Sequence, residues 1–182
     1  MHVLVKEPFN IIITHYPGYD NFSMAREQLR EILEEIRIID TGQSIILAKV
    51  KDPYEAVKII RDSGLRETPI LRVIPVDRVT DIYVDRVAEA VRELLLGKSK
   101  PEESFKIKID GHLYALREDV SERLHKDEAI KIIAEGIDRP VDLRNPDWLV
   151  YVKAVRLYRV TELASVTVCR PPDILSFAPR ES

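Results

Sequence analysis

The sequence predicts an α/β protein, of the α+β kind, that is built from two domains. Along its 182 residues, runs of β-branched residues alternate with stretches in which apolar residues recur at helical spacing. Hydrophobic residues make up 45% and charged residues 32%, which is typical of a folded globular protein. The segment Gly97–Ser104 is polar, rich in turn residues and without periodicity. We therefore expect a first domain over residues 1–96, a linker over 97–104 and a second domain over 105–182.

The first expected elements are a buried strand and an amphipathic helix. Ile11–Thr14 is a β-branched run of the kind found in strands buried on both faces. From Asn21 the pattern becomes helical, and Asn21 or Asp20 can cap the exposed amides at the start of the helix. The apolar positions of this helix are Ala25, Leu29, Ile32, Leu33 and Ile36.

A hairpin, a second helix and a fourth strand follow. The predicted hairpin joins Arg37–Asp40 to Ser44–Val50 through Gly42, which tolerates a tight turn. Asp52-Pro53-Tyr54-Glu55 is a helix start, with Asp52 as the cap and Pro53 in the first turn. The helix ends near Gly64, and Ile70–Val76 forms the next strand. The order strand, helix, strand, strand, helix, strand predicts a ferredoxin-like split βαβ domain.

A trailing helix over Asp81–Leu96 completes the first domain. In the second domain, Phe105, Ile107 and Ile109 alternate with charged residues, as expected of a strand with one apolar face. The remaining expectations are a turn at Asp110-Gly111, an ambiguous strand or helix over Tyr114–Leu124, a helix from Lys126, strands over Trp148–Tyr158 and Leu163–Cys169, and an irregular tail.

Metal, disulfide and cofactor chemistry have no support in the sequence. Cys169 is the one cysteine, and the four histidines (His2, His15, His112 and His125) show no spacing that would place two of them on one metal ion. Glycine-rich phosphate loops and a serine-nucleophile elbow are both missing. We therefore expect no metal, no cofactor and no catalytic residue, and a non-catalytic accessory protein that is not an enzyme.

The N-terminal sequence lacks the features of a secretory signal, and no apolar run is long enough to span a bilayer. These features predict a cytoplasmic protein without a membrane partner. Only two Gln, three Asn, one Cys and two Met accompany many charged residues, which favours a thermophile as the source.

The charge balance argues against a general affinity for polyanions. The net charge is −3, with 15 Lys and Arg against 18 Asp and Glu up to Ser104, and 13 of each thereafter. Binding to a nucleic acid would therefore require a local basic face.

The segment Val141–Tyr158, VDLRNPDWLVYVKAVRLY, combines a polar turn with a long apolar strand. Arg144-Asn145-Pro146-Asp147 has the composition of a β-turn, in which Asn bonds to the backbone and Pro fixes φ. On residue chemistry alone, a structural role is favoured over a functional one.

Three segments together resemble the THUMP domain, an RNA-binding module of tRNA-modifying proteins. They are the strand FKIKI from Phe105, the helix LHKDEAIKIIAEGI, and the turn V-D-L-x-N-P-D from Val141. An N-terminal ferredoxin-like domain is the usual companion of this module. In particular, the chain resembles stand-alone THUMP proteins that serve as adaptors for a tRNA cytidine acetyltransferase. The resemblance implies a tRNA-binding adaptor that presents tRNA to a separate modification enzyme, with tRNA and that acetyltransferase as partners.

Phosphate and 2′-hydroxyl contacts, rather than base reading, are expected to carry the RNA binding. The candidate RNA-binding residues are Arg72, Lys106, Lys108, Arg123, His125, Lys126, Lys131 and Arg144. For each of them a solvated surface side chain is the simpler interpretation. The alternative function is a protein-interaction or small-ligand module built on the ferredoxin-like domain, which the acidic first half of the chain favours.

Overall fold

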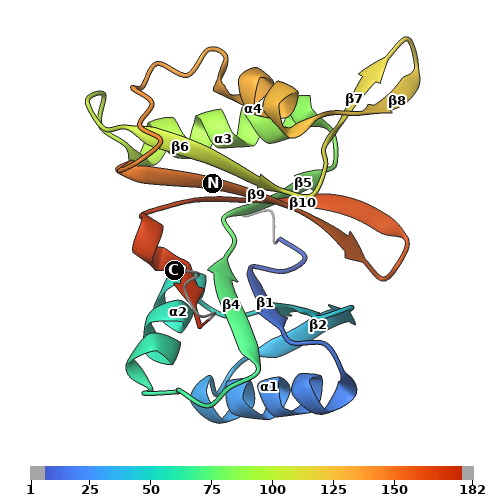
Figure 1. Cartoon of the computed structure of the whole chain (residues 1–182), viewed down its shortest axis with the longest axis vertical. Coiled ribbons are helices and arrows are strands. Elements are labelled where there is room, and N and C mark those ends of the chain that lie inside the picture. Colours follow the sequence, from blue (N-terminus) through green and yellow to red (C-terminus); the bar gives the residue numbers. More distant parts are fainter. Residues whose placement is uncertain (1–6, 178–182) are drawn as a thin grey trace, which may run out of the picture. The chain divides into compact units, whose positions relative to one another are not determined.

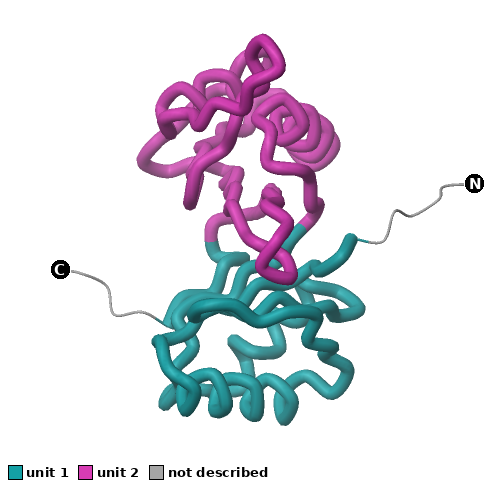
Figure 2. Tube along the Cα trace, turned by 90° about the vertical axis from the view of Figure 1, so that its right-hand side faces the viewer, with its two compact units in different colours: residues 1–76, 172–182 teal, residues 77–171 magenta. Residues whose placement is uncertain are grey.

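The computed structural model describes residues 7–177, and the chain divides into two compact units (Figure 2). Unit 1 comprises Met1–Val76 with Pro172–Ser182, and unit 2 comprises Asp77–Pro171. The division therefore falls between Val76 and Asp77, about twenty residues before the linker that the sequence predicts. In addition, residues 172–177, which follow unit 2 in the sequence, belong to unit 1.

Unit 1 is a five-stranded antiparallel sheet with two helices (Figure 1). Its strands lie in the order β11-β4-β1-β3-β2. The elements are β1 (Ile11–His15), α1 (Tyr19–Ile32), β2 (Arg37–Gly42), β3 (Ile45–Lys49), α2 (Pro53–Asp62), β4 (Ile70–Pro75) and β11 (Leu175–Ser176). Apart from β11, both the chain order and the strand order are those of the split βαβ unit, which confirms the ferredoxin-like prediction.

The start of α2 is the one that the sequence predicts. The Asp52 carboxylate accepts hydrogen bonds from the amides of Tyr54 and Glu55, at 3.1 and 3.2 Å. By contrast, α1 begins at Tyr19 after Gly18, whose φ of 110° makes it the cap residue in place of Asn21 or Asp20. The side-chain Nδ2 of Asn21 instead donates to the Pro17 carbonyl at 2.8 Å. A glycine with positive φ needs no side-chain cap to redirect the chain, so the composition rule for caps fails at this position.

Unit 2 is a four-stranded sheet with helices on one face, plus a separate hairpin (Figure 1). The sheet order is β5-β10-β9-β6, in which β6 and β9 are parallel and the other pairs antiparallel. The elements are β5 (Arg78–Asp81), α3 (Val84–Lys98), β6 (Phe105–Asp110), β7 (Tyr114–Arg117), β8 (Val120–Arg123), α4 (Lys126–Ala134), β9 (Trp148–Leu157) and β10 (Thr161–Cys169); a 3₁₀ turn, Pro171–Asp173, follows.

The helix α3 belongs to unit 2 because its apolar stripe is buried there. Val87, Val91 and Leu95 are fully buried, in one cluster with residues of β6, β9 and β10. The sequence shows that this helix has an apolar face but not which sheet the face contacts, because periodicity carries no information about the partner. The sequence analysis places this helix in the first domain, whereas in the structure it packs in unit 2.

Two further differences concern short strands. The ambiguous stretch Tyr114–Leu124 is the β7–β8 hairpin, whose turn residues Glu118 and Asp119 have positive φ of 51° and 63°. Sequence analysis expects Gly or Asn at such positions, so the signal was weak. The strand β5 was not predicted, and β11 lies in the tail that was expected to be irregular. Both pair over only two to four residues, so their register depends on the neighbouring strand.

No helix in residues 7–177 combines the length and apolar character required to cross a membrane. Within the same residues, no group of three or more His, Cys, Asp and Glu side chains could hold a metal ion. Cys169 is buried in β10.

Candidate nucleic-acid interface

The candidate site lies where β6 ends and α4 begins. The two elements belong to a β6–α4–β9 crossover, and the parallel register places Asp110 opposite Lys153. The Lys153 ammonium lies 2.6 Å from the Asp110 carboxylate, and the Tyr151 hydroxyl donates to the same oxygen at 3.2 Å. Lys126, the first residue of α4, acts on this carboxylate through its charge. We call Asp110, Lys126, Tyr151 and Lys153 the β6-end cluster.

The acid of this cluster is held ionised by its neighbours. Partial burial raises the pKa of the Asp110 carboxyl, whereas the hydrogen bond and the charge of Lys153 lower it. The Tyr151 hydroxyl and the Lys126 charge act in the same direction, so the pKa of Asp110 lies below its ordinary value. Asp110 thereby fixes Lys153, while Lys126 remains exposed at the surface.

A cavity of about 260 Å³ adjoins the cluster, because His112 follows Asp110 closely and Ala154 follows Lys153. Two guanidinium groups line this cavity, those of Arg123 and Arg156. Arg156 is paired with Glu162 at 3.1 Å, whereas Arg123 is exposed on β8 with no ion pair among the described residues. The full lining is Ile82, His112, Tyr114, Arg123, Ala154, Val155, Arg156 and Glu162.

A glycine just after the end of β6 allows the chain to pass close to β9 beside the cavity. Gly111 has φ of +93°, and a Cβ atom there would lie 2.7 Å from the Cβ atom of Ala154. Only glycine fits this position, because the conformation and the space both exclude a side chain. Gly111 thus sets the turn that separates Asp110 from His112.

The start of α4 is an imperfect anion site. Its N-cap residue, His125, makes no side-chain cap hydrogen bond, so the first amides have no such partner. However, Asp127 and Glu128 lie in the first turn, where their charges would repel a phosphate. Glu128 is neutralised by Arg117, which also contacts Glu122, at 3.0 and 3.1 Å. Arg117 is therefore committed to holding the hairpin against α4.

The predicted RNA-binding residues divide into separate groups. Arg123, His125 and Lys126 lie together at the β6-end cluster and its cavity. Lys106 and Lys108 lie on the face of β6 opposite its buried residues, with Lys106 half-buried and Lys108 exposed. Lys131 points away from the core, because the buried positions of α4 are Ala129 and Ile133.

The other two predicted residues lie elsewhere. Arg144 precedes β9, at the end of the sheet where β6 begins, so the length of β6 separates it from Lys126 by roughly 20 Å. Arg72 is in β4 of unit 1. The structure therefore brings three of the eight candidates to one site.

The turn before β9 serves the architecture of unit 2. The Asp142 carboxylate accepts from the amides of Arg144 and Asn145, at 3.0 Å each, and these bonds lower the pKa of Asp142. The Asp147 carboxylate accepts from the Ser104 amide at 2.8 Å and from its hydroxyl at 3.2 Å. These bonds fasten the start of β9 to the start of β6, which agrees with the structural interpretation of the turn.

The comparisons with known proteins identify the fold. No family model and no curated protein matches the sequence. Among solved structures, PH1313 from Pyrococcus horikoshii Ot3 matches with a TM-score of 0.61 and 16% identity, over 88% of this chain and 54% of that one. TrmN from Thermus thermophilus matches with a TM-score of 0.50 and 19% identity, over 87% and 44%. A 4-thiouridine synthetase in complex with RNA and ATP matches with a TM-score of 0.49 and 18% identity, over 89% and 42%.

The chain has a THUMP-like α/β fold. The predicted fold class, a ferredoxin-like domain followed by a THUMP domain, is thereby confirmed. The chain spans about half the length of the solved structures that it matches.

The prediction that this protein is not an enzyme, which was drawn from the absence of catalytic motifs, is wrong. The solved structures that match this THUMP-like chain include TrmN, a methyltransferase. The absence of a nucleophile or phosphate loop from this THUMP-like chain therefore does not show that the protein is not an enzyme.

Sequence analysis missed three residues of the THUMP-like unit: Lys153, Arg156 and, as a site residue, His112. Lys153 and Arg156 lie in a mostly apolar strand, and a charged residue in such a strand is ordinarily interpreted as a solvent-facing side chain. Their relation to Asp110 and Arg123 arises from strand pairing and from the β7–β8 hairpin, both of which are long-range contacts. The one signal in the sequence was the alternation of charged and apolar residues along β9, which indicates that Lys153 lies on its polar face.

Proposed function

We propose that this chain binds tRNA through the cationic end of its THUMP-like unit and acts in tRNA modification. The fold supports this proposal, because THUMP-like structures are those of tRNA-modification proteins. The local charge also supports it, because the cluster and its cavity contain more cations than carboxylates. The cations are Lys126, Lys153, Arg123 and Arg156, and the carboxylates are Asp110 and Glu162. A protein with net charge −3 needs such a local excess to attract phosphate.

The observation that carries the proposal is the exposed pair Arg123 and Lys126. Leu124 and His125 lie between them; Leu124 is buried, and its backbone amide donates to the Leu113 carbonyl at 2.9 Å, which holds this stretch of backbone in place. A segment whose backbone is already ordered loses little backbone freedom on binding a phosphate chain, and shape rather than sequence then selects the RNA. Lys106, Lys108 and Arg144 extend the proposed surface along the edge strand β6.

The modification served is, in our proposal, cytidine acetylation, with this chain presenting tRNA to the acetyltransferase. Support for this finer statement comes from the segments FKIKI, LHKDEAIKIIAEGI and VDLRNPD, which resemble those of the stand-alone adaptors. Deleting the gene in the source organism should remove acetylated cytidine from tRNA, as measured by mass spectrometry of nucleosides. An unchanged level of acetylcytidine would show that the chain does not serve the acetyltransferase, and the proposal that it binds tRNA would be unaffected.

Fluorescence titration of tRNA across a salt series tests the binding site. The double variant R123A/K126A should weaken binding and reduce the slope of log K against log salt by up to about 2, one for each lost phosphate contact. K131A tests the outer face of α4, and R144A tests the far end of β6; each should lower the slope by no more than about 1.

A matched control removes two exposed arginines from α3, Arg86 and Arg92. R86A/R92A deletes the same charge from the same unit, so a general electrostatic effect would lower affinity equally in both double variants. Equal losses, or an R123A/K126A protein that binds tRNA like the wild type, would show that the β6-end cluster is not the site.

A further inference from the structure

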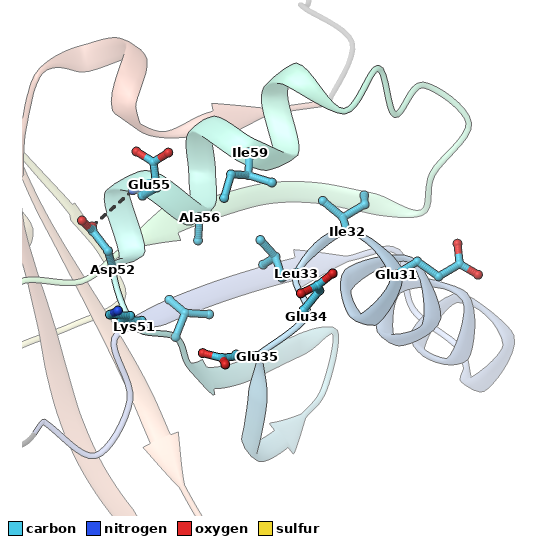
Figure 3. Close-up of a pocket in the computed structure, with 11 residues that line it drawn as sticks. Glu31, Ile32, Leu33, Glu34, Glu35, Lys51, Asp52, Glu55, Ala56 and Ile59 are labelled. Carbon is cyan, nitrogen blue, oxygen red and sulfur yellow. Dashed lines mark hydrogen bonds between the residues drawn. The ribbon is translucent and has the colours of Figure 1, made fainter.

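A groove in unit 1 lies between the end of α1 and the start of α2 (Figure 3). Its volume is about 430 Å³, and it is larger than the cavity beside the β6-end cluster. Its apolar lining residues come from α1 and α2 and from the positions that directly follow α1 and β3. They are Ile32, Leu33, Val50, Ala56 and Ile59.

Ile59 is the most exposed part of this apolar floor. It lies in the middle of α2 beside Ile60, yet it is 43% exposed whereas Ile60 is fully buried. The buried stripe of α2 is Ala56, Val57 and Ile60, so Ile59 falls outside the stripe that the unit needs for its own core. A single exposed isoleucine is common, but this one extends a continuous apolar floor and enlarges the patch.

The rim of the groove is acidic. Its carboxylates are Glu31, Glu34, Glu35, Asp52 and Glu55, and all of them are exposed. Lys51 is the one cation among the lining residues. Asp52 uses one oxygen to cap α2, and the dashed line in Figure 3 marks its bond to the Glu55 amide. Within residues 7–177 the other four carboxylates of the rim form no ion pair. Carboxylates gathered around an apolar floor give the groove a negative potential.

We infer that this groove docks a basic amphipathic segment of a partner protein. Apolar side chains of the segment would fill the floor, and flanking Lys and Arg side chains would meet the carboxylates of the rim. This division into an apolar centre and a charged rim is that of protein interfaces, including grooves that accept an amphipathic helix. The inference stands apart from tRNA binding, since it uses other residues in the other unit.

Other occupants fit the groove less well. A nucleic acid would bring phosphates against the acidic rim. A small ligand requires polar groups that converge inside the pocket, and the floor residues are all apolar. In a symmetric dimer formed through this groove, carboxylates would face carboxylates, because the same patch contributes from both copies.

Selection from a phage-displayed library of random short peptides on the full-length chain tests the inference. Recovered peptides should combine aliphatic or aromatic residues with Lys and Arg, and each is then measured by fluorescence anisotropy at low and high salt. The rim variant E34K/E35K should weaken their binding by at least about tenfold at low salt, and less at high salt. The floor variant I59S should weaken binding at both salt concentrations, because it removes apolar contact.

The control is E27K/D62K, which reverses two exposed carboxylates of α1 and α2 that do not line the groove. Its affinity should stay within about twofold of the wild type, because neither residue lines the groove, although the change in charge equals that of the rim variant. Selected peptides without basic residues, or equal binding to the wild type and E34K/E35K, would overturn the inference. So would a dimer, seen by light scattering, that I59S dissociates, because the occupant would then be a second copy.

Discussion

Asp110 and Lys153 form an ion pair across β6 and β9, with 2.6 Å between the carboxylate oxygen and the ammonium nitrogen. The Lys153 side chain is 15% exposed and the Asp110 side chain 47% exposed, so the pair is buried on one side and open to solvent on the other. The pair joins the two parallel strands at the point where β6 ends and the proposed tRNA site begins. Its geometry therefore affects both the stability of unit 2 and the position of the nearby cations.

Replacing Asp110 with Asn should lower the free energy of unfolding by about 1–2 kcal/mol, because Lys153 then loses its counter-charge in a largely buried position. Urea unfolding at pH 7, followed by circular dichroism, measures the change. The exposed pair Arg156–Glu162 offers a control: E162Q should change stability by less than about 0.5 kcal/mol. Equal losses in the two variants would show that burial adds nothing to the Asp110 pair.

The same substitution should alter the response to acid. Because the folded pKa of Asp110 is lowered, the group stabilises the fold fully above its unfolded, ordinary value of 3.8. That stabilisation is lost as the pH falls through the lower folded value. Unfolding free energies measured between neutral pH and pH 3 should therefore decrease less steeply in D110N than in the wild type. Parallel curves would contradict the lowered pKa.

Gly111→Ala should destabilise the protein by about 2–4 kcal/mol, because the new Cβ would collide with Ala154 and the positive φ would be strained. Thermal unfolding followed by circular dichroism gives the shift in midpoint. Gly97→Ala is the matched control, since Gly97 lies exposed in α3 with nothing within 4 Å of an added Cβ atom. There the same change should stabilise the helix by about 0.5–1 kcal/mol.

Asp147→Ala should cost about 1–2 kcal/mol of stability, because the Ser104 amide and hydroxyl lose a charged acceptor. Asn145→Ala, in the same turn, should stay within about 0.5 kcal/mol, since only its backbone amide takes part in the turn. Chemical denaturation of both variants checks the difference. If folded D147A binds tRNA with wild-type affinity, the turn is architectural; a selective loss in N145A would make it a contact.

Ile60→Ala should destabilise unit 1 by about 2–5 kcal/mol, because it leaves a cavity in a fully buried position. Ile59→Ala should cost less than about 0.5 kcal/mol, since Ile59 is exposed in the groove. The two substitutions are chemically identical and adjacent, so helix propensity cancels between them. A large loss for I59A would mean that Ile59 belongs to the core rather than to a docking surface.

Local signals predicted a large part of the fold. The order of elements in unit 1, the Asp52 cap, the alternation along β6 and the turn before β9 all follow from chemistry within a few residues, which the sequence states directly. The short turns without glycine escaped prediction because Glu118 and Asp119 adopt positive φ only where the paired strands require it. Gly18 escaped for the opposite reason, since glycine caps α1 without the side chain that cap rules look for.

The sequence by itself determined which faces of the helices and strands are apolar, and hence that two layered α/β units form. Only the tertiary structure decided that α3 packs in unit 2, that Lys126 lies beside Asp110 rather than beside Arg144, and that Ile59 faces a groove. The physical reason is that periodicity reports whether a residue is buried, whereas the identity of its neighbour depends on pairing between strands far apart in the chain. The site and the groove both consist of such neighbours.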